Sequence, residues 1–151
     1  TSNDPSAYIV SDFSRGGKTA LVKFGEKFLS IESVLAYGKF NNAMIVKKEG
    51  VNGIYLYDGG NLIHSITSND GIKGFSSVNY DGNYFYFIGS KNDNKLVFKL
   101  DPETYELKDY ITVPADGSKL SIINNWMYLK KTGTNKIYQL APDTKNFKLL
   151  D

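Results

Sequence analysis

The chain has no cysteine, one histidine and one arginine among its 151 residues, and its formal net charge is only +2. Without cysteine, disulfides, thiolate nucleophiles and thiolate metal sites are excluded. The near-neutral charge and the lone Arg15 argue against a nucleic-acid partner, because arginine provides the bidentate contacts to phosphates and bases. No apolar run approaches the roughly 18 residues of a membrane-spanning helix, so no membrane span is predicted.

Tyrosine (11), phenylalanine (9) and glycine (14) are abundant. This mixture favours β-strands that are joined by tight turns. The chain begins at Thr1 in a polar stretch rather than at methionine. We therefore expect a processed or excised chain, consistent with signal-peptide removal and with an extracellular, periplasmic or cell-surface location.

One short segment occurs twice, as Leu-Asp-Pro-Glu-Thr at 100–104 and Leu-Ala-Pro-Asp-Thr at 140–144. The two prolines are 40 residues apart (142 − 102), and each turn follows an apolar run that opens with Asn-Lys. Self-similarity at this period is typical of repeat proteins in which each unit is one small sheet.

Further matches extend the repeat. The run at 84–88 aligns with 126–130, the run at 94–98 aligns with 135–139, and fainter copies precede them. Turn residues separate the runs at Asp58-Gly59, Asp81-Gly82 and Asn124-Asn125, as tight hairpins require. The pattern predicts about four repeats of four antiparallel strands, at approximately 7–34, 35–68, 74–113 and 119–151.

The stretch 79–104 carries an Asp-Gly turn, a tyrosine-rich strand, an asparagine before the next strand and an Asp-x-x-Thr-type turn. In these features it resembles the blades of YVTN-type and quinoprotein-like β-propellers. The third repeat matches well, the fourth moderately, and the first two by strand order. The resemblance implies an all-β fold, a β-propeller of about four blades. The tryptophan docking motif of quinoproteins is not matched, and Trp126 is expected in the core.

The first blade lacks its innermost strand, because only residues 1–6 precede Ala7. Propellers close with four to eight blades, and most need more than four. We therefore expect a partial ring, or a ring that a protein partner or a second chain completes.

No catalytic group of residues is evident, and no metal or cofactor is predicted. The only histidine, His64, shares a strand face with Leu62 and Ile66 and is interpreted as structural. The run at 90–95 offers oxygen ligands but one carboxylate, Asp93, so a polar loop is favoured over a calcium site. Any Ser-His triad would depend on the single histidine, and the serines lack a nucleophile-elbow context.

The charges sort by loop position. If the strand order is correct, one face of the propeller collects basic residues at Arg15, Lys18, Lys47, Lys48, Lys73, Lys91, Lys95, Lys119, Lys130 and Lys131. The opposite face collects acids at Glu26, Asp58, Asp81, Asp101, Glu103, Glu106 and Asp143. Such a field concentrates anionic ligands on the basic side. The candidate ligand-binding residues are Arg15, Lys47, Lys48, Lys91, Lys130 and Lys131; the alternative is that lysine merely keeps the loops soluble.

The leading hypothesis is a non-catalytic binding or scaffold propeller module of an exported or cell-envelope protein. It recognises an anionic ligand or a protein partner on its lysine-rich face. One alternative is a fragment of a propeller enzyme, of the lyase or dehydrogenase type, with catalytic residues outside this chain. Another is a structural surface-layer repeat.

Overall fold

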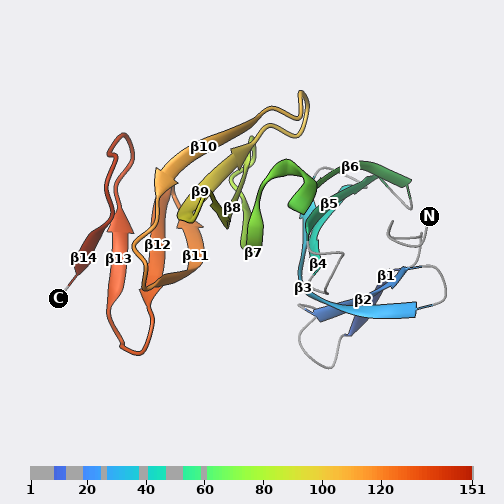
Figure 1. Cartoon of the computed structure of the whole chain (residues 1–151), viewed down its shortest axis with the longest axis horizontal. Coiled ribbons are helices and arrows are strands. Elements are labelled where there is room, and N and C mark those ends of the chain that lie inside the picture. The colour runs from blue at the N-terminus through green and yellow to red at the C-terminus, as the bar shows by residue number, and fades with distance from the viewer. Residues whose placement is uncertain are drawn as a thin grey trace. The chain divides into compact units, whose positions relative to one another are not determined.

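The chain folds into antiparallel β-sheets (Figure 1). The computed structural model describes residues 9–12, 19–24, 27–37, 41–46, 53–58 and 61–150. Within these residues there are three sheets, one short 3₁₀ turn at Ser68–Asp70 and no α-helix. The chain divides into two compact units, Thr1–Phe75 and Ser76–Asp151. The predicted all-β class is confirmed.

The first sheet has six strands whose order in the sheet follows the chain. They are β1 (Ile9–Asp12), β2 (Thr19–Phe24), β3 (Lys27–Tyr37), β4 (Asn41–Val46), β5 (Gly53–Asp58) and β6 (Asn61–Thr67). β3 pairs with β2 through residues 27–31 and with β4 through residues 31–37, with an irregularity between Ile31 and Ser33. One long strand therefore joins two hairpin systems.

This differs from the separate blades expected at 7–34 and 35–68. The segment 28–37 contains neither glycine nor proline, so nothing forces the backbone out of the extended conformation at the expected boundary. The outer strand of the first repeat continues directly into the inner strand of the second. Both repeats thus lie in a single sheet.

The remaining strands form two sheets of four antiparallel strands. The second sheet comprises β7 (Lys73–Tyr80), β8 (Phe85–Lys91), β9 (Asn94–Leu100) and β10 (Leu107–Thr112). The third comprises β11 (Gly117–Ile123), β12 (Trp126–Lys131), β13 (Ile137–Leu140) and β14 (Lys148–Leu150). Each of these sheets has the four antiparallel strands that the sequence predicts for one unit.

Tight turns set the register of these hairpins. Asn92 and Asp93 between β8 and β9 have φ of 51° and 64°, and Asn124 and Asn125 between β11 and β12 have φ of 49° and 70°. Two positive φ angles in a row give a turn whose twist matches that of the paired strands. The turn predicted at Asn124-Asn125 is confirmed, and the 90–95 run is a hairpin.

Aspartate side chains stabilise the turns at the other ends of the strands. Asp81 Oδ1 accepts the backbone N–H groups of Asn83 and Tyr84, both at 2.8 Å. In the repeated proline turn, Asp101 Oδ1 accepts the N–H of Glu103 at 2.8 Å, and this bond lowers the pKa of the Asp101 carboxyl. Asx turns of this kind replace backbone hydrogen bonds where the strand reverses.

The core of the C-terminal unit lies between the second and third sheets. One face of the second sheet, made by Tyr86, Ile88, Val97 and Ile111, packs against Leu120, Met127, Leu129 and Leu140 of the third. Each such side chain contributes about 1.5–3 kcal/mol when it is fully buried. Asn79 Nδ2 also donates to the Leu120 carbonyl at 2.9 Å, which ties β7 to β11.

Trp126 was expected in this core, and the structure corrects that expectation. Met127 and Leu129 of β12 are 5% and 1% exposed and point into the core. Successive side chains of a strand point to opposite faces, so Trp126, which is half-buried, lies on the other face of the third sheet. An aromatic residue in the sequence indicates a strand, but it does not indicate which face of the sheet packs against another sheet.

Candidate binding site

The six candidate ligand-binding residues, taken with Lys18, divide into three groups. Arg15, Lys47 and Lys48 lie outside the described residues, as does Lys18. Lys91 and Lys131 each lie near a carboxylate: Lys91 Nζ is 3.5 Å from Asp109 Oδ1, and Lys131 Nζ is 3.9 Å from Asp116 Oδ2. Lys130 is exposed and lines a hollow on the third sheet. Of the described candidates, Lys130 is therefore the one best placed to meet an external anion.

Asp116 is held by a second partner. Its Oδ1 atom accepts the Tyr138 hydroxyl at 2.7 Å, and this hydrogen bond raises the pKa of the tyrosine. The backbone carbonyl of Asp116 accepts the N–H of Thr132 at 2.8 Å. The Asp116 carboxylate therefore braces the connection between β10 and β11 and offsets the Lys131 charge.

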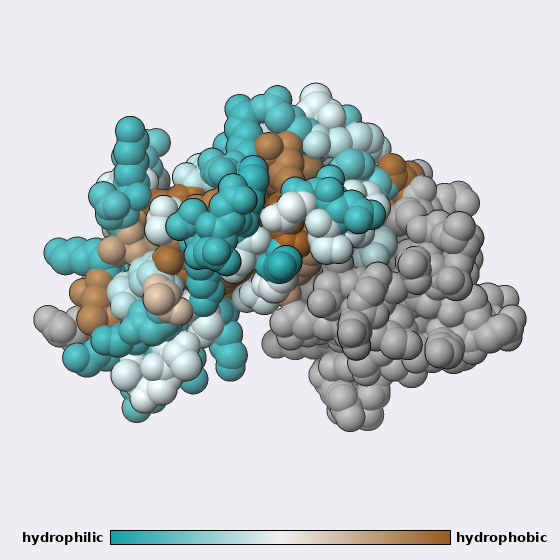
Figure 2. All heavy atoms as spheres, viewed as in Figure 1, coloured by the Kyte–Doolittle hydropathy of each residue, from teal (hydrophilic) through white to brown (hydrophobic). Residues whose placement is uncertain are grey.

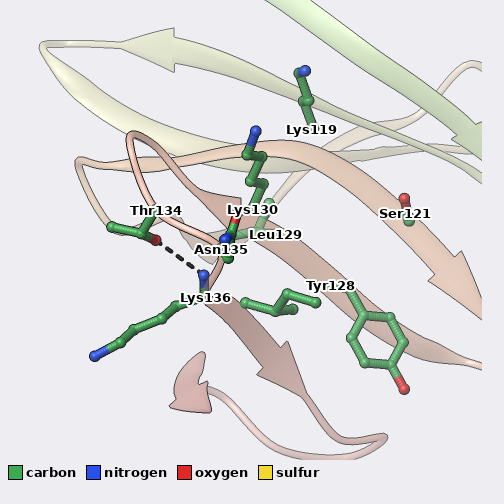
Figure 3. A pocket seen from close by; sticks show the side chains of 9 residues that line it. Lys119, Ser121, Tyr128, Leu129, Lys130, Thr134, Asn135 and Lys136 are labelled. Atoms are coloured by element: carbon green, nitrogen blue, oxygen red, sulfur yellow. Dashed lines mark hydrogen bonds between the residues drawn. The ribbon is translucent and has the colours of Figure 1, made fainter. Parts of the chain in front are cut away.

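The hollow on the third sheet has a volume of about 380 Å³. Its lining includes three lysines, Lys119, Lys130 and Lys136, together with Tyr128 and Ile137. In Figure 3, Lys119 and Lys130 extend to the same side, whereas Lys136 extends in the opposite direction. None of the three forms an ion pair with a carboxylate in the described part of the chain. The hollow thus combines apolar side chains with lysines that form no ion pair among the described residues.

Strand alternation produces this arrangement. Met127 and Leu129 occupy the core side of β12, so Tyr128 and Lys130 point outward. Lys130 pairs with Ile137 of β13, which places both side chains on the same face.

A bulge in β11 brings in Lys119. The pairing of β11 with β12 is irregular between Ser118 and Ser121, and Lys119 has a φ of 55°. A bulge re-aims a side chain relative to the regular strand. Ser77, which lies 42 residues earlier (119 − 77), has a φ of 56°. The same backbone conformation therefore occurs in β7 and in β11, once with a serine and once with a lysine.

Lys136 was not among the residues predicted from the sequence. Its Asn-Lys pair at 135–136 repeats the pair at 94–95, so the repeat itself could have pointed to it. The two lysines serve differently: Lys95 Nζ donates to the Gly117 carbonyl and ties the second sheet to the third. Lys136 N–H donates to Thr134 Oγ1 at 3.1 Å, which orders the loop beside the hollow.

The hollow lies on a sheet face that is open in the structure. The second sheet has Ile88, Val97 and Ile111 side by side, and they are 2%, 0% and 8% exposed beneath the third sheet. The positions that correspond by strand pairing in the third sheet are Lys130, Ile137 and Leu150. Ile137 is 43% and Leu150 is 38% exposed. Figure 2 shows hydrophobic surface among hydrophilic side chains near this C-terminal end.

The other sequence candidates have less to offer. His64 in β6 is half-buried; burial lowers its pKa, and Asp70 opposes the shift. No group of three or more histidine or acidic side chains suited to a metal ion occurs among the residues that the structure describes. Within those same residues, no helix has the length and apolarity needed to cross a membrane.

Comparison with known proteins adds no family assignment. No protein-family model matches the chain. Its sequence also finds no match among curated proteins.

Proposed function

We propose that the chain is part of a β-propeller of the YVTN or quinoprotein-like type, acting as a non-catalytic binding or scaffold module of an exported or cell-envelope protein. In this proposal the basic hollow on the third sheet binds an acidic segment of a protein partner. The hollow carries the proposal, because three lysines line it together with apolar side chains and form no ion pair with a carboxylate of the described chain.

The stacking of sheets in the C-terminal unit supports the propeller. Each of the two sheets is a four-stranded antiparallel meander, and they meet face to face through an apolar core. This is how neighbouring blades pack in a propeller. The open face of the third sheet is equivalent to the face of the second sheet that the third sheet covers. The acidic segment would then belong to the protein partner or second chain whose sheet covers this face and completes the ring.

The chemistry of the hollow favours an acidic polypeptide. Exposed lysines bind carboxylates through screened, salt-dependent attraction. Ile137 and Tyr128 offer apolar contact beside the lysines, and covering exposed apolar surface of this kind stabilises a complex. A segment that carries both acidic groups and an apolar residue would satisfy both features.

The experiment measures binding of fluorescein-labelled poly-L-glutamate by fluorescence anisotropy at several salt concentrations. We expect binding that weakens with salt, and a Lys119→Ser/Lys130→Ser double variant that binds roughly threefold to tenfold more weakly. The control is Lys73→Ser/Lys145→Ser, which removes the same charge from two exposed lysines outside the hollow.

Two outcomes would contradict the proposal. If the Lys119/Lys130 variant binds as tightly as the wild type, the hollow is not the binding site. If both double variants lose the same affinity, the binding follows net charge alone. A urea titration of each variant establishes that the fold is intact.

A further inference from the structure

A second cleft in the C-terminal unit has the opposite chemistry. It lies between the second and third sheets and has a volume of about 280 Å³. Tyr86 and Tyr110 of the second sheet line one side, and Ile122, Met127 and Pro142 of the third sheet line the other. Asp81 and Asp143 add a carboxylate from a turn of each sheet. No lysine lines this cleft.

The tyrosine wall is fixed by its own contacts. The Tyr86 and Tyr110 rings meet edge to face, with centroids 5.3 Å apart. Tyr86 is 6% exposed, whereas Tyr110 is 44% exposed. One ring is therefore anchored in the core and the other presents aromatic surface to solvent.

The same tyrosine cluster already receives one ammonium group from within the chain. Lys99 Nζ lies 4.0 Å from the centroid of the Tyr84 ring and 5.6 Å from that of Tyr110. Lys99 lines a neighbouring hollow with Asp101, Glu106 and Lys108, where the two carboxylates offset the two ammonium charges. Cations are attracted to the faces of aromatic rings within about 6 Å. The geometry of this cluster thus suits an ammonium group.

We propose that the cleft between the second and third sheets binds a small organic ammonium ligand, with Asp81 and Asp143 opposing its charge and Tyr110 contacting its substituents. The cleft holds about nine water volumes, at roughly 30 Å³ each, which is enough for a quaternary ammonium head and a short tail. Ile122, Met127 and Pro142 would contact the alkyl groups. This proposal does not depend on the basic hollow, which lies on the other face of the third sheet.

The carboxylates of Asp81 and Asp143 differ in how strongly they stabilise the local backbone. Asp81 Oδ1 accepts two backbone N–H groups, so replacing Asp81 would disturb the turn as well as the cleft. Asp143 is exposed, and its φ is 64°. Asparagine tolerates this left-handed conformation as well as aspartate does. Asp143→Asn therefore removes the charge and leaves the turn in place.

The experiment titrates the full chain with choline and with 3,3-dimethylbutan-1-ol, an uncharged molecule of nearly the same shape, and follows tyrosine ring resonances by NMR. We expect choline to shift the Tyr86 and Tyr110 resonances saturably and the neutral analogue to bind much more weakly. Asp143→Asn should weaken choline binding roughly threefold to tenfold. Tyr110→Leu should reduce the preference for choline over the analogue.

Asp93→Asn is the matched control. Asp93 is also an exposed turn aspartate with a φ of 64°, but it lies in the β8–β9 turn and does not line the cleft. The Asp93→Asn variant should bind choline as tightly as the wild type does. Absence of saturable choline binding, equal binding of the neutral analogue, or an equal loss in Asp93→Asn would each overturn the proposal. An unchanged urea midpoint for Asp143→Asn excludes unfolding as the cause of weaker binding.

Discussion

Leu129→Ala tests the packing of the third sheet against the second. Leu129 is 1% exposed and belongs to the cluster between these sheets. Deleting a buried leucine side chain to alanine costs about 2–5 kcal/mol, because apolar contacts are lost and a cavity remains. The C-terminal unit has 76 residues (151 − 75), and at roughly 0.05–0.15 kcal/mol per residue its stability is about 4–11 kcal/mol. The variant should therefore lose a large part of that stability.

The assay is urea unfolding followed by tryptophan fluorescence. The chain has a single tryptophan, Trp126, which lies in β12, the strand that contains Leu129. Its emission therefore reports on the third sheet. The control is Ile137→Ala, which removes apolar atoms from the open face, where the side chain is 43% exposed. We expect that control to cost less than about 1 kcal/mol. Equal losses in the two variants would refute the assignment of covered and open faces.

Three further results are expected. Gly117→Ala should cost about 1–3 kcal/mol, because its Cβ would lie 3.1 Å from Leu129 Cδ1 and 3.2 Å from the Pro114 carbonyl oxygen; urea titration should show a smaller loss when Leu129 is already alanine. Asn125→Val should destabilise the β11–β12 hairpin by about 1–2 kcal/mol, because a β-branched residue does not tolerate the φ of 70°, whereas Asn125→Gly should not. Burial, reinforced by Asp81, raises the pKa of Tyr86 above its ordinary value of 10.0. Its contribution to stability is complete below that pH and is lost as the pH rises toward the folded-state value, so Tyr86→Phe should flatten the decline in urea midpoint above pH 10.

Local patterns predicted the local structure well. The proline-turn repeat and the Asn124-Asn125 turn located the strands of the second and third sheets, because register depends on nearby turn residues. The continuity of β3 was missed, since a strand that switches partners has no turn to mark the change. The outward position of Trp126 was also missed, because a tryptophan does not reveal which sheet face receives a neighbour.

The basic hollow and the cleft between the sheets also depend on contacts that local sequence patterns do not reveal. Lys119, Lys130 and Lys136 meet because a bulge and strand pairing bring three segments together, and only the first two were counted as basic candidates. Asp81 and Asp143 are 62 residues apart (143 − 81), and the stacking of two sheets brings them to one cleft. The sequence placed both among the acidic loop residues, but their shared cleft follows from tertiary packing.

In every sheet, strand order follows chain order. Each strand therefore pairs with one that has just been synthesised, which keeps contacts local and favours rapid formation of each sheet. The second sheet has all its strands once Thr112 has emerged from the ribosome. Its apolar face at Tyr86, Ile88 and Val97, however, remains exposed to water until β11 and β12 follow. During this interval the exposed apolar face makes the nascent chain prone to aggregation. Chains that stall after Thr112 should therefore need a chaperone, although none of their own strands is missing.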